Sequence, residues 1–218
     1  MVASPCNPAG TMLHPDELAA LAAWCDGAGV RLISDEIYHG LNYDSPIATA
    51  AAFSASAIVD NSFSKYFSMT GWRIGWLLVP DDLVDSVFRL AGNFAICPPT
   101  LSQLAAVAAF DAYAELDANV DRYRANRELL LRRLPEIGLD KLAPADGAFY
   151  VYADVSRWTD DAMAWTARLL DETGVAVAPG IDFDPVDGGK FIRFCFAGDG
   201  RDIARGVEEL GKWLATRA

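Results

Sequence analysis

The residues best suited to chemistry in this sequence are two hydroxyls, an amine and a guanidinium that lie close together. They are Ser62, Ser64, Lys65 and Arg73, and they follow a short apolar run at 57–59. The run predicts a buried strand, and ligands of open α/β sheets bind where such strands end. A lysine there can act as a nucleophile when its pKa is lowered, and serines with an arginine can hold a phosphate group. The segment therefore predicts a site that combines a reactive amine with a phosphate cradle.

An amine beside a phosphate cradle is the combination that pyridoxal 5'-phosphate (PLP) requires for a Schiff base. Glycines on either side of the arginine, Gly71 and Gly75, would let the backbone approach such a ligand closely. The whole stretch 62–75 resembles, without a gap, the lysine-attachment signature of class I/II PLP-dependent aminotransferases of fold type I. The resemblance implies PLP as the cofactor and Lys65 as the catalytic residue. The PLP ligands that it implies in this stretch are Ser62, Ser64, Lys65 and Arg73.

The loop at residues 4–10 carries the next matching motif. Two prolines, an asparagine and a glycine predict a rigid turn there. Aminotransferases have a similar Asn-Pro-x-Gly loop, whose asparagine binds the phenolic oxygen of PLP. By this resemblance Asn7 would contribute to both cofactor binding and substrate binding, although Ala9 replaces the threonine that is more usual in the family.

A strand predicted at 30–34 leads to an acidic residue and a tyrosine. It follows a helix that Pro15 can open, and a helix joined to a strand by a short connection favours a parallel sheet. A buried carboxylate at the end of this strand needs a cationic partner, and a protonated pyridine nitrogen would be one. Asp35 and Tyr38 are similar to the Asp-x-x-Tyr of the family, which implies that both bind PLP.

An arginine near the C-terminus lies in a strongly alternating segment at 191–197. Its apolar residues Ile192, Phe194 and Phe196 are predicted to face the core. Arg193 therefore projects from the opposite face. In the family, an arginine in a similar segment binds the α-carboxylate of the substrate bidentately, through two N–H groups. The resemblance assigns this substrate-binding role to Arg193.

The order of predicted elements indicates an α/β chain with two domains. By resemblance, 1–118 is the C-terminal part of the PLP-binding large domain, a mostly parallel sheet with helices on both faces. Residues 119–218 are expected to form a small α+β domain. A helical pattern at 101–134 contains this boundary, with a kink or break expected at 115–119. The strands predicted in the small domain are 148–153, 174–178 and 191–197.

Composition excludes several classes of function. A formal net charge of −12 argues against non-specific binding to nucleic acid or to an anionic membrane. With only two histidines we expect no metal site. The four cysteines form no CxxC pair and predict free thiols that are buried or half-buried. No signal peptide and no apolar run of about 18 residues is visible, so we expect a cytoplasmic protein.

Members of the family carry a long portion before the Asn-Pro-x-Gly loop, and the resemblance implies that this chain is a truncated form without it. The implied function is transfer of an amino group from an L-amino acid to a 2-oxo acid, in amino acid metabolism, by a homodimer. Two alternatives remain open. One is a PLP-dependent lyase or synthase of the same fold, and the other is a non-catalytic aminotransferase-like fragment or regulatory module. The sequence does not identify the amino acid donor or the acceptor.

Overall fold

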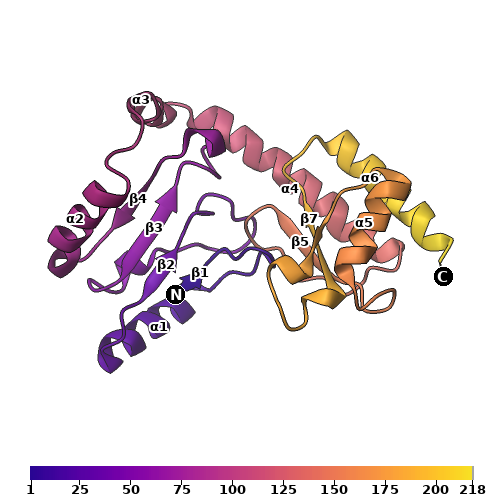
Figure 1. Cartoon of the computed structure of the whole chain (residues 1–218), viewed down its shortest axis with the longest axis horizontal. Helices are drawn as coiled ribbons and strands as arrows, with labels where there is room; N and C mark the ends of the chain where they lie inside the picture. The colour runs from indigo at the N-terminus through magenta and orange to yellow at the C-terminus, as the bar shows by residue number, and fades with distance from the viewer. Residues whose placement is uncertain (218) are drawn as a thin grey trace. The chain divides into compact units, whose positions relative to one another are not determined.

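The structure is a computed structural model of the chain, and it describes residues 1–217 (Figure 1). The chain divides into two compact units. The first unit holds Met1–Pro5 and Met12–Val120, and the second holds Cys6–Thr11 and the residues from Asp121 onward. Each unit contains its own β-sheet, and each is described by itself below.

The sheet of the first unit has four strands in the order β1-β2-β3-β4. They are β1 (Val2–Ala3), β2 (Ile33–Asp35), β3 (Ile58–Ser62) and β4 (Gly75–Leu78). The first three run parallel, and β4 pairs antiparallel with β3. The prediction of a mostly parallel sheet is therefore confirmed. Because β2 and β3 are parallel neighbours, their carboxyl ends lie at the same edge of the sheet.

Helix α1 (Pro15–Ala28) packs on this sheet. It begins at Pro15, as predicted, and ends at Gly29, whose φ of 66° is in the left-handed region that glycine adopts without strain. Its buried side chains, among them Leu18 and Cys25, form one core with Val59 of β3. This core fixes β2 and β3 relative to each other and so positions the loops at their carboxyl ends.

Three helices come after β4, and the break between the last two differs from the prediction. They are α2 (Val84–Phe94), α3 (Thr100–Ala109) and α4 (Tyr113–Glu136). The break expected at 115–119 lies instead at 110–112, and α4 continues through 115–119. The amides of Asp111 and Ala112 bond to carbonyls three residues back and close α3 with a tight turn. Leu116 is 6% exposed and gives the polar stretch a buried face, which keeps it helical.

The second unit has an antiparallel sheet in the order β5-β7-β6. Its strands are β5 (Tyr150–Asp154), β6 (Ala178–Pro179) and β7 (Phe191–Cys195), and its helices after α4 are α5 (Ala162–Thr173) and α6 (Gly200–Ala215). The strand predicted at 174–178 is wrong except for its last residue, because pairing with β7 begins only at Ala178. Short 3-10 turns lie at Ala50–Ala52, Thr70–Trp72, Asp81–Leu83, Gly180–Asp182 and Gly188–Lys190.

The alternation of β7 is confirmed. Ile192 and Phe196 are fully buried and Phe194 is 7% exposed. The side chain of Arg193 is on the other face of the strand. The two aromatic rings of Trp165 and Trp213 join α5 to α6 in an edge-to-face contact 4.9 Å between centroids. These contacts give the second unit a core of its own.

The four cysteines are free thiols, as predicted, but their burial was only partly predicted. Cys25 is buried and Cys6 is half-buried, whereas Cys97 and Cys195 are exposed. Cys195 is exposed because it belongs to the face of β7 opposite the buried phenylalanines. Within residues 1–217, no helix combines the length and the apolar character needed to cross a membrane.

Candidate active site

Lys65 lies in the loop 63–74 that connects β3 to β4, which we call the lysine turn. The backbone of this turn is fixed on both sides of the lysine. The hydroxyl of Thr70 donates to the carbonyl of Ser64 over 2.6 Å, and the amide of Ser68 donates to the carbonyl of Lys65 over 3.0 Å. Ser68 has a φ of 56°, which lets the chain reverse direction there. The amine of Lys65 is thus presented from a rigid turn at the carboxyl end of a parallel strand.

The hydroxyls and the guanidinium predicted beside the lysine belong to the same turn. Ser62 is the last residue of β3, and its hydroxyl accepts from the amide of Ser64 at 3.0 Å and donates to the Ser64 hydroxyl at 2.8 Å. Arg73 has a φ of 52° and donates to the carbonyl of Thr70 at 2.8 Å. Because Gly75 pairs with Ser62 across the two strands, Arg73 returns to the end of β3 where the serines lie. Two hydroxyls and a guanidinium in one turn suit a phosphate group.

Asp35 and Tyr38 lie at and just beyond the end of β2, at the same edge of the sheet. One carboxylate oxygen of Asp35 accepts from the amide of Ile37 at 3.1 Å, which fixes the side chain. Tyr38 is 4% exposed, and its ring centroid is 5.3 Å from the Nζ atom of Lys65. The structure therefore brings the tyrosine and the lysine together.

A second carboxylate, Asp60, lies beside Asp35 on the neighbouring strand and was not singled out from the sequence. The two residues are partners in the β2–β3 register, so both side chains lie on one face of the sheet. The Oδ1 atom of Asp60 is buried and has no hydrogen-bond partner among residues 1–217. Burial, and then the negative charge of Asp35, raise the pKa of Asp60. Only the register of the two strands could have revealed this pair.

A half-buried histidine also lies just beyond β2. His39 Nδ1 lies 3.4 Å from Glu36, which is 2% exposed and accepts bonds from the Ser34 hydroxyl and the Ala50 amide. Burial lowers the pKa of His39, although the negative charge of Glu36 works in the opposite direction. The histidine is consequently neutral at neutral pH and packs as an uncharged ring.

In the second unit, Arg193 and Asn7 are in direct contact. The Nη1 atom of Arg193 donates to the side-chain oxygen of Asn7 at 2.6 Å. The guanidinium carbon lies 4.1 Å from the ring centroid of Tyr150 and 4.5 Å from that of Phe183. The Nε atom of Arg193 is buried and has no hydrogen-bond partner in the described part of the chain. Sequence reasoning found the arginine and the asparagine but missed both rings, which reach Arg193 only through the fold.

The predicted residues thus form two groups, one in each unit. Within the first unit the structure gathers six of them at the shared end of β2 and β3, and within the second unit it joins the other two. The first group is Asp35, Tyr38, Ser62, Ser64, Lys65 and Arg73. The second group is Asn7 and Arg193.

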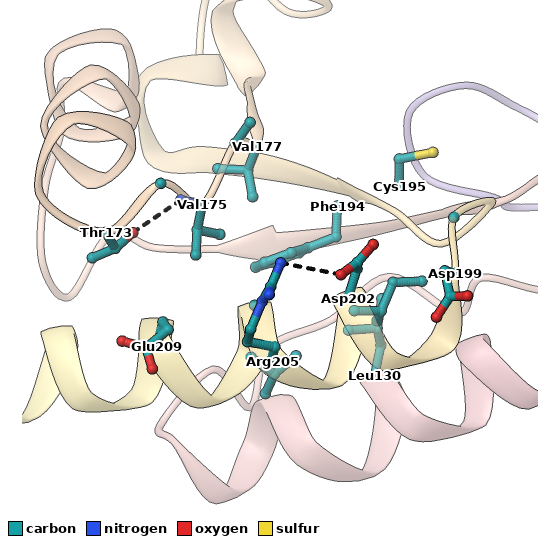
Figure 2. A pocket seen from close by; sticks show the side chains of 16 residues that line it. Leu130, Thr173, Val175, Val177, Phe194, Cys195, Asp199, Asp202, Arg205 and Glu209 are labelled. Atoms are coloured by element: carbon teal, nitrogen blue, oxygen red, sulfur yellow. Dashed lines mark hydrogen bonds and ion pairs between the residues drawn. The ribbon is translucent and has the colours of Figure 1, made fainter.

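The second unit also has a cavity of about 670 Å³ that is lined by none of these eight residues (Figure 2). It lies between the segment after α5, strand β7 and helix α6. Val175 and Phe194 give it an apolar wall, and Arg205, paired with Asp202 at 3.1 Å, lies on the helix opposite. Phe194, which lines it, and Arg193 lie on opposite faces of β7.

Comparison with known proteins identifies the family. Residues 1–210 match the family described as aminotransferase class I and II, and the chain belongs to it. The valine–pyruvate aminotransferase of Mycobacterium tuberculosis is 57% identical over 100% of this chain and 57% of its own length. A probable N-acetyl-LL-diaminopimelate aminotransferase of Bacillus subtilis is 33% identical over 94% of this chain and 52% of its own length.

Solved structures agree with this assignment and confirm the predicted fold class. An aminotransferase from Mycobacterium tuberculosis matches with a TM-score of 0.97 at 57% identity, over 99% of this chain and 57% of that one. An aromatic aminotransferase from Pyrococcus horikoshii matches with a TM-score of 0.89 at 29% identity, over 99% of this chain and 59% of that one. The chain therefore spans somewhat more than half the length of these relatives.

Proposed function

We propose that this chain carries the active-site lysine and most of the cofactor ligands of a PLP-dependent aminotransferase. Such an enzyme transfers an amino group from an L-amino acid to a 2-oxo acid. The observation that carries the proposal is the position of Lys65, in a fixed turn at the shared carboxyl edge of β2 and β3, 5.3 Å from the ring of Tyr38. Membership in the aminotransferase family supports it.

The residues present suit PLP group by group. The hydroxyls of Ser62 and Ser64 and the guanidinium of Arg73 would hold the phosphate. Asp35, one oxygen of which is tied to a backbone amide, would pair with the protonated ring nitrogen. Tyr38 would donate to the phenolic oxygen, and the family resemblance adds Asn7 there. When bound, PLP supplies an electron sink for the negative charge that develops at the α-carbon of an amino acid.

Lys65 has two tasks in this proposal. Its Nζ atom would hold the cofactor covalently until the substrate amine displaces it, and the freed amine would then take the proton that leaves the substrate α-carbon. A proton carrier must stay within reach of that carbon, so a rigid attachment of the lysine backbone is an advantage. The bonds of Thr70 and Ser68 to the carbonyls of Ser64 and Lys65 provide it.

Arg193 would bind the α-carboxylate of the substrate. Its guanidinium lies against the rings of Tyr150 and Phe183, which restrict its orientation, and one nitrogen is already held by Asn7. The buried Nε atom lacks a partner among the described residues, and a carboxylate can accept from that nitrogen and a terminal nitrogen together. Arginine is the residue of choice for such a two-point contact.

The choice of substrates to try first is guided by the relatives. The 57% identity to a valine–pyruvate aminotransferase supports an aliphatic amino acid such as valine as the donor and pyruvate as the acceptor. The homodimer, the cytoplasmic location and the two-domain division at residue 118 stay predictions, supported by the family resemblance.

The test is reductive trapping. The chain of residues 1–218 is incubated with PLP, reduced with borohydride, digested and mapped by mass spectrometry. The sequence has four lysines, and the exposed Lys141, Lys190 and Lys212 serve as internal standards. We expect the label on Lys65 and its loss in Lys65→Ala, but not in Lys141→Ala. Folded protein that labels all four lysines equally would overturn the proposal.

A further inference from the structure

The residue directly after Lys65 is held by a hydrogen bond to a distant helix. The hydroxyl of Tyr66 donates to Oδ1 of Asp117, on helix α4, over 2.6 Å. Burial, and then the bond to Asp117, raise the pKa of Tyr66, so the phenol remains a donor at physiological pH. The hydroxyl end of the tyrosine is therefore anchored to a residue that lies 51 positions further along the chain.

The ring of Tyr66 is also fixed along its length. It fills the space beside Gly40, where a Cβ atom would lie only 2.6 Å from Cδ2 of the tyrosine. Gly40 has a φ of 88°, a conformation that suits glycine, and it follows Tyr38 by two residues. The rings of Phe67 and Tyr113 lie 5.2 and 6.4 Å from that of Tyr66. Tyr66 thus joins the segment after β2 to the lysine turn.

These contacts have a consequence for the neighbouring lysine. Adjacent residues share a planar peptide unit, so fixing the ring of Tyr66 limits the backbone torsions that remain to Lys65. The turn bonds already hold the carbonyls of Ser64 and Lys65. We propose that Tyr66 is a positioning residue that sets the direction of the Lys65 amine, and that Asp117 is the acceptor that holds it. This inference rests on the proposed function, because it assigns Tyr66 to the same site.

The experiment compares three variants in the trapping assay. Tyr66→Phe removes the donor, Asp117→Ala removes the acceptor, and Asp117→Asn keeps an acceptor oxygen without the charge. We expect the first two each to lower the labelling of Lys65 by about fivefold, the effect of one lost hydrogen bond. Asp117→Asn should restore most of it. The labelling of Lys141, Lys190 and Lys212 should not change.

A second readout is the dissociation constant for PLP, measured by the quenching of tryptophan fluorescence. It should rise by a similar factor in Tyr66→Phe and in Asp117→Ala. The double variant should be no worse than either single one, because the two residues act through one bond. Tyr123→Phe is the control, since it deletes the hydroxyl of a buried tyrosine that belongs to neither group of predicted site residues, and it should behave as the wild type.

The outcomes separate this inference from the proposed function. If the wild-type chain is not labelled at Lys65, the proposed function fails. If the wild type is labelled and Tyr66→Phe and Asp117→Ala are labelled equally well, the positioning role is wrong. Thermal unfolding shows which variants are folded. If Tyr66→Phe does not fold, the comparison of Asp117→Ala with Asp117→Asn decides whether the positioning role is correct. Equal labelling of those two would overturn the inference.

Discussion

Arg193 and Asn7 are joined by a hydrogen bond of 2.6 Å although 186 residues separate them in the sequence. The bond ties the segment Cys6–Thr11 to β7 within the second unit. Asn7→Ala should therefore loosen this segment, by the roughly 1 kcal/mol that one hydrogen bond contributes. We expect the amides of Cys6–Thr11 to exchange with deuterium several-fold faster. Asn93→Ala, which removes a bond within α2, is the control, and unchanged exchange at 6–11 would contradict the prediction.

Gly10 anchors the same segment by its backbone. Its φ is 66°, and a Cβ atom there would lie 2.8 Å from both the Cα of Ala145 and the carbonyl oxygen of Gly147. Gly10→Ala should lower the free energy of unfolding by about 2 kcal/mol or more, because backbone strain and a backbone clash add. Gly174→Ala is the matched control: its φ is 76° but nothing lies within 4 Å, so only strain remains, about 1 kcal/mol. If urea unfolding showed that Gly10→Ala and Gly174→Ala lower the free energy of unfolding equally, the clash at Gly10 would be disproved.

His39 should make the protein sensitive to mild acid. Burial lowers the pKa of His39 in the folded state. At a pH between the folded-state and unfolded-state pKa values, the unfolded state therefore binds more protons than the folded state. The stability that the neutral imidazole contributes is complete above the unfolded value of about 6.5 and is lost as pH falls through the folded one. We expect a lower urea midpoint at pH 5.5 than at pH 7.5, and a smaller difference in His39→Gln. A variant with the full pH dependence of the wild type would show that other groups are responsible.

Asp60 should be a source of instability at neutral pH. Its pKa is raised in the folded state, so it stabilises the fold only when protonated, and that contribution is lost as pH rises through the folded pKa. Asp60→Asn removes a charge from beside Asp35 and should stabilise the protein at pH 7 by about 0.5–1 kcal/mol. The gain should shrink toward pH 4. Asp111, an exposed aspartate of the same unit, is the control, and Asp111→Asn should give no gain. If Asp60→Asn also gave no gain, the repulsion between Asp60 and Asp35 would be refuted.

Local patterns were sufficient to predict several elements of the fold. The alternation of Ile192, Phe194 and Phe196 fixed the buried face of β7 because a strand exposes every second residue to the same side. Pro15 marked the start of α1 because its ring fits only the first turn of a helix. The break predicted from the polar residues at 115–119 was wrong, since one buried leucine at 116 was enough to keep that stretch helical.

The residues of the site were predictable because they belong to recognisable motifs, but most of the contacts between them were not. The turn with Ser62, Ser64 and Lys65 is local, and its chemistry follows from residue types alone. The contacts of Tyr66 with Asp117, and of Arg193 with the rings of Tyr150 and Phe183, join residues that are distant in sequence. Such contacts depend on register and packing, which a single sequence does not specify.

The assignment of Cys6–Thr11 to the second unit, between two stretches of the first, has a consequence for dissection and engineering. The chain crosses from one unit to the other three times, after Pro5, after Thr11 and after Val120. No single cut separates two complete modules. A gene fragment that starts at Asp121 would lack Asn7, which bonds to Arg193, and Gly10, which lies against Ala145. A chimera would have to exchange the hexapeptide 6–11 together with the C-terminal half.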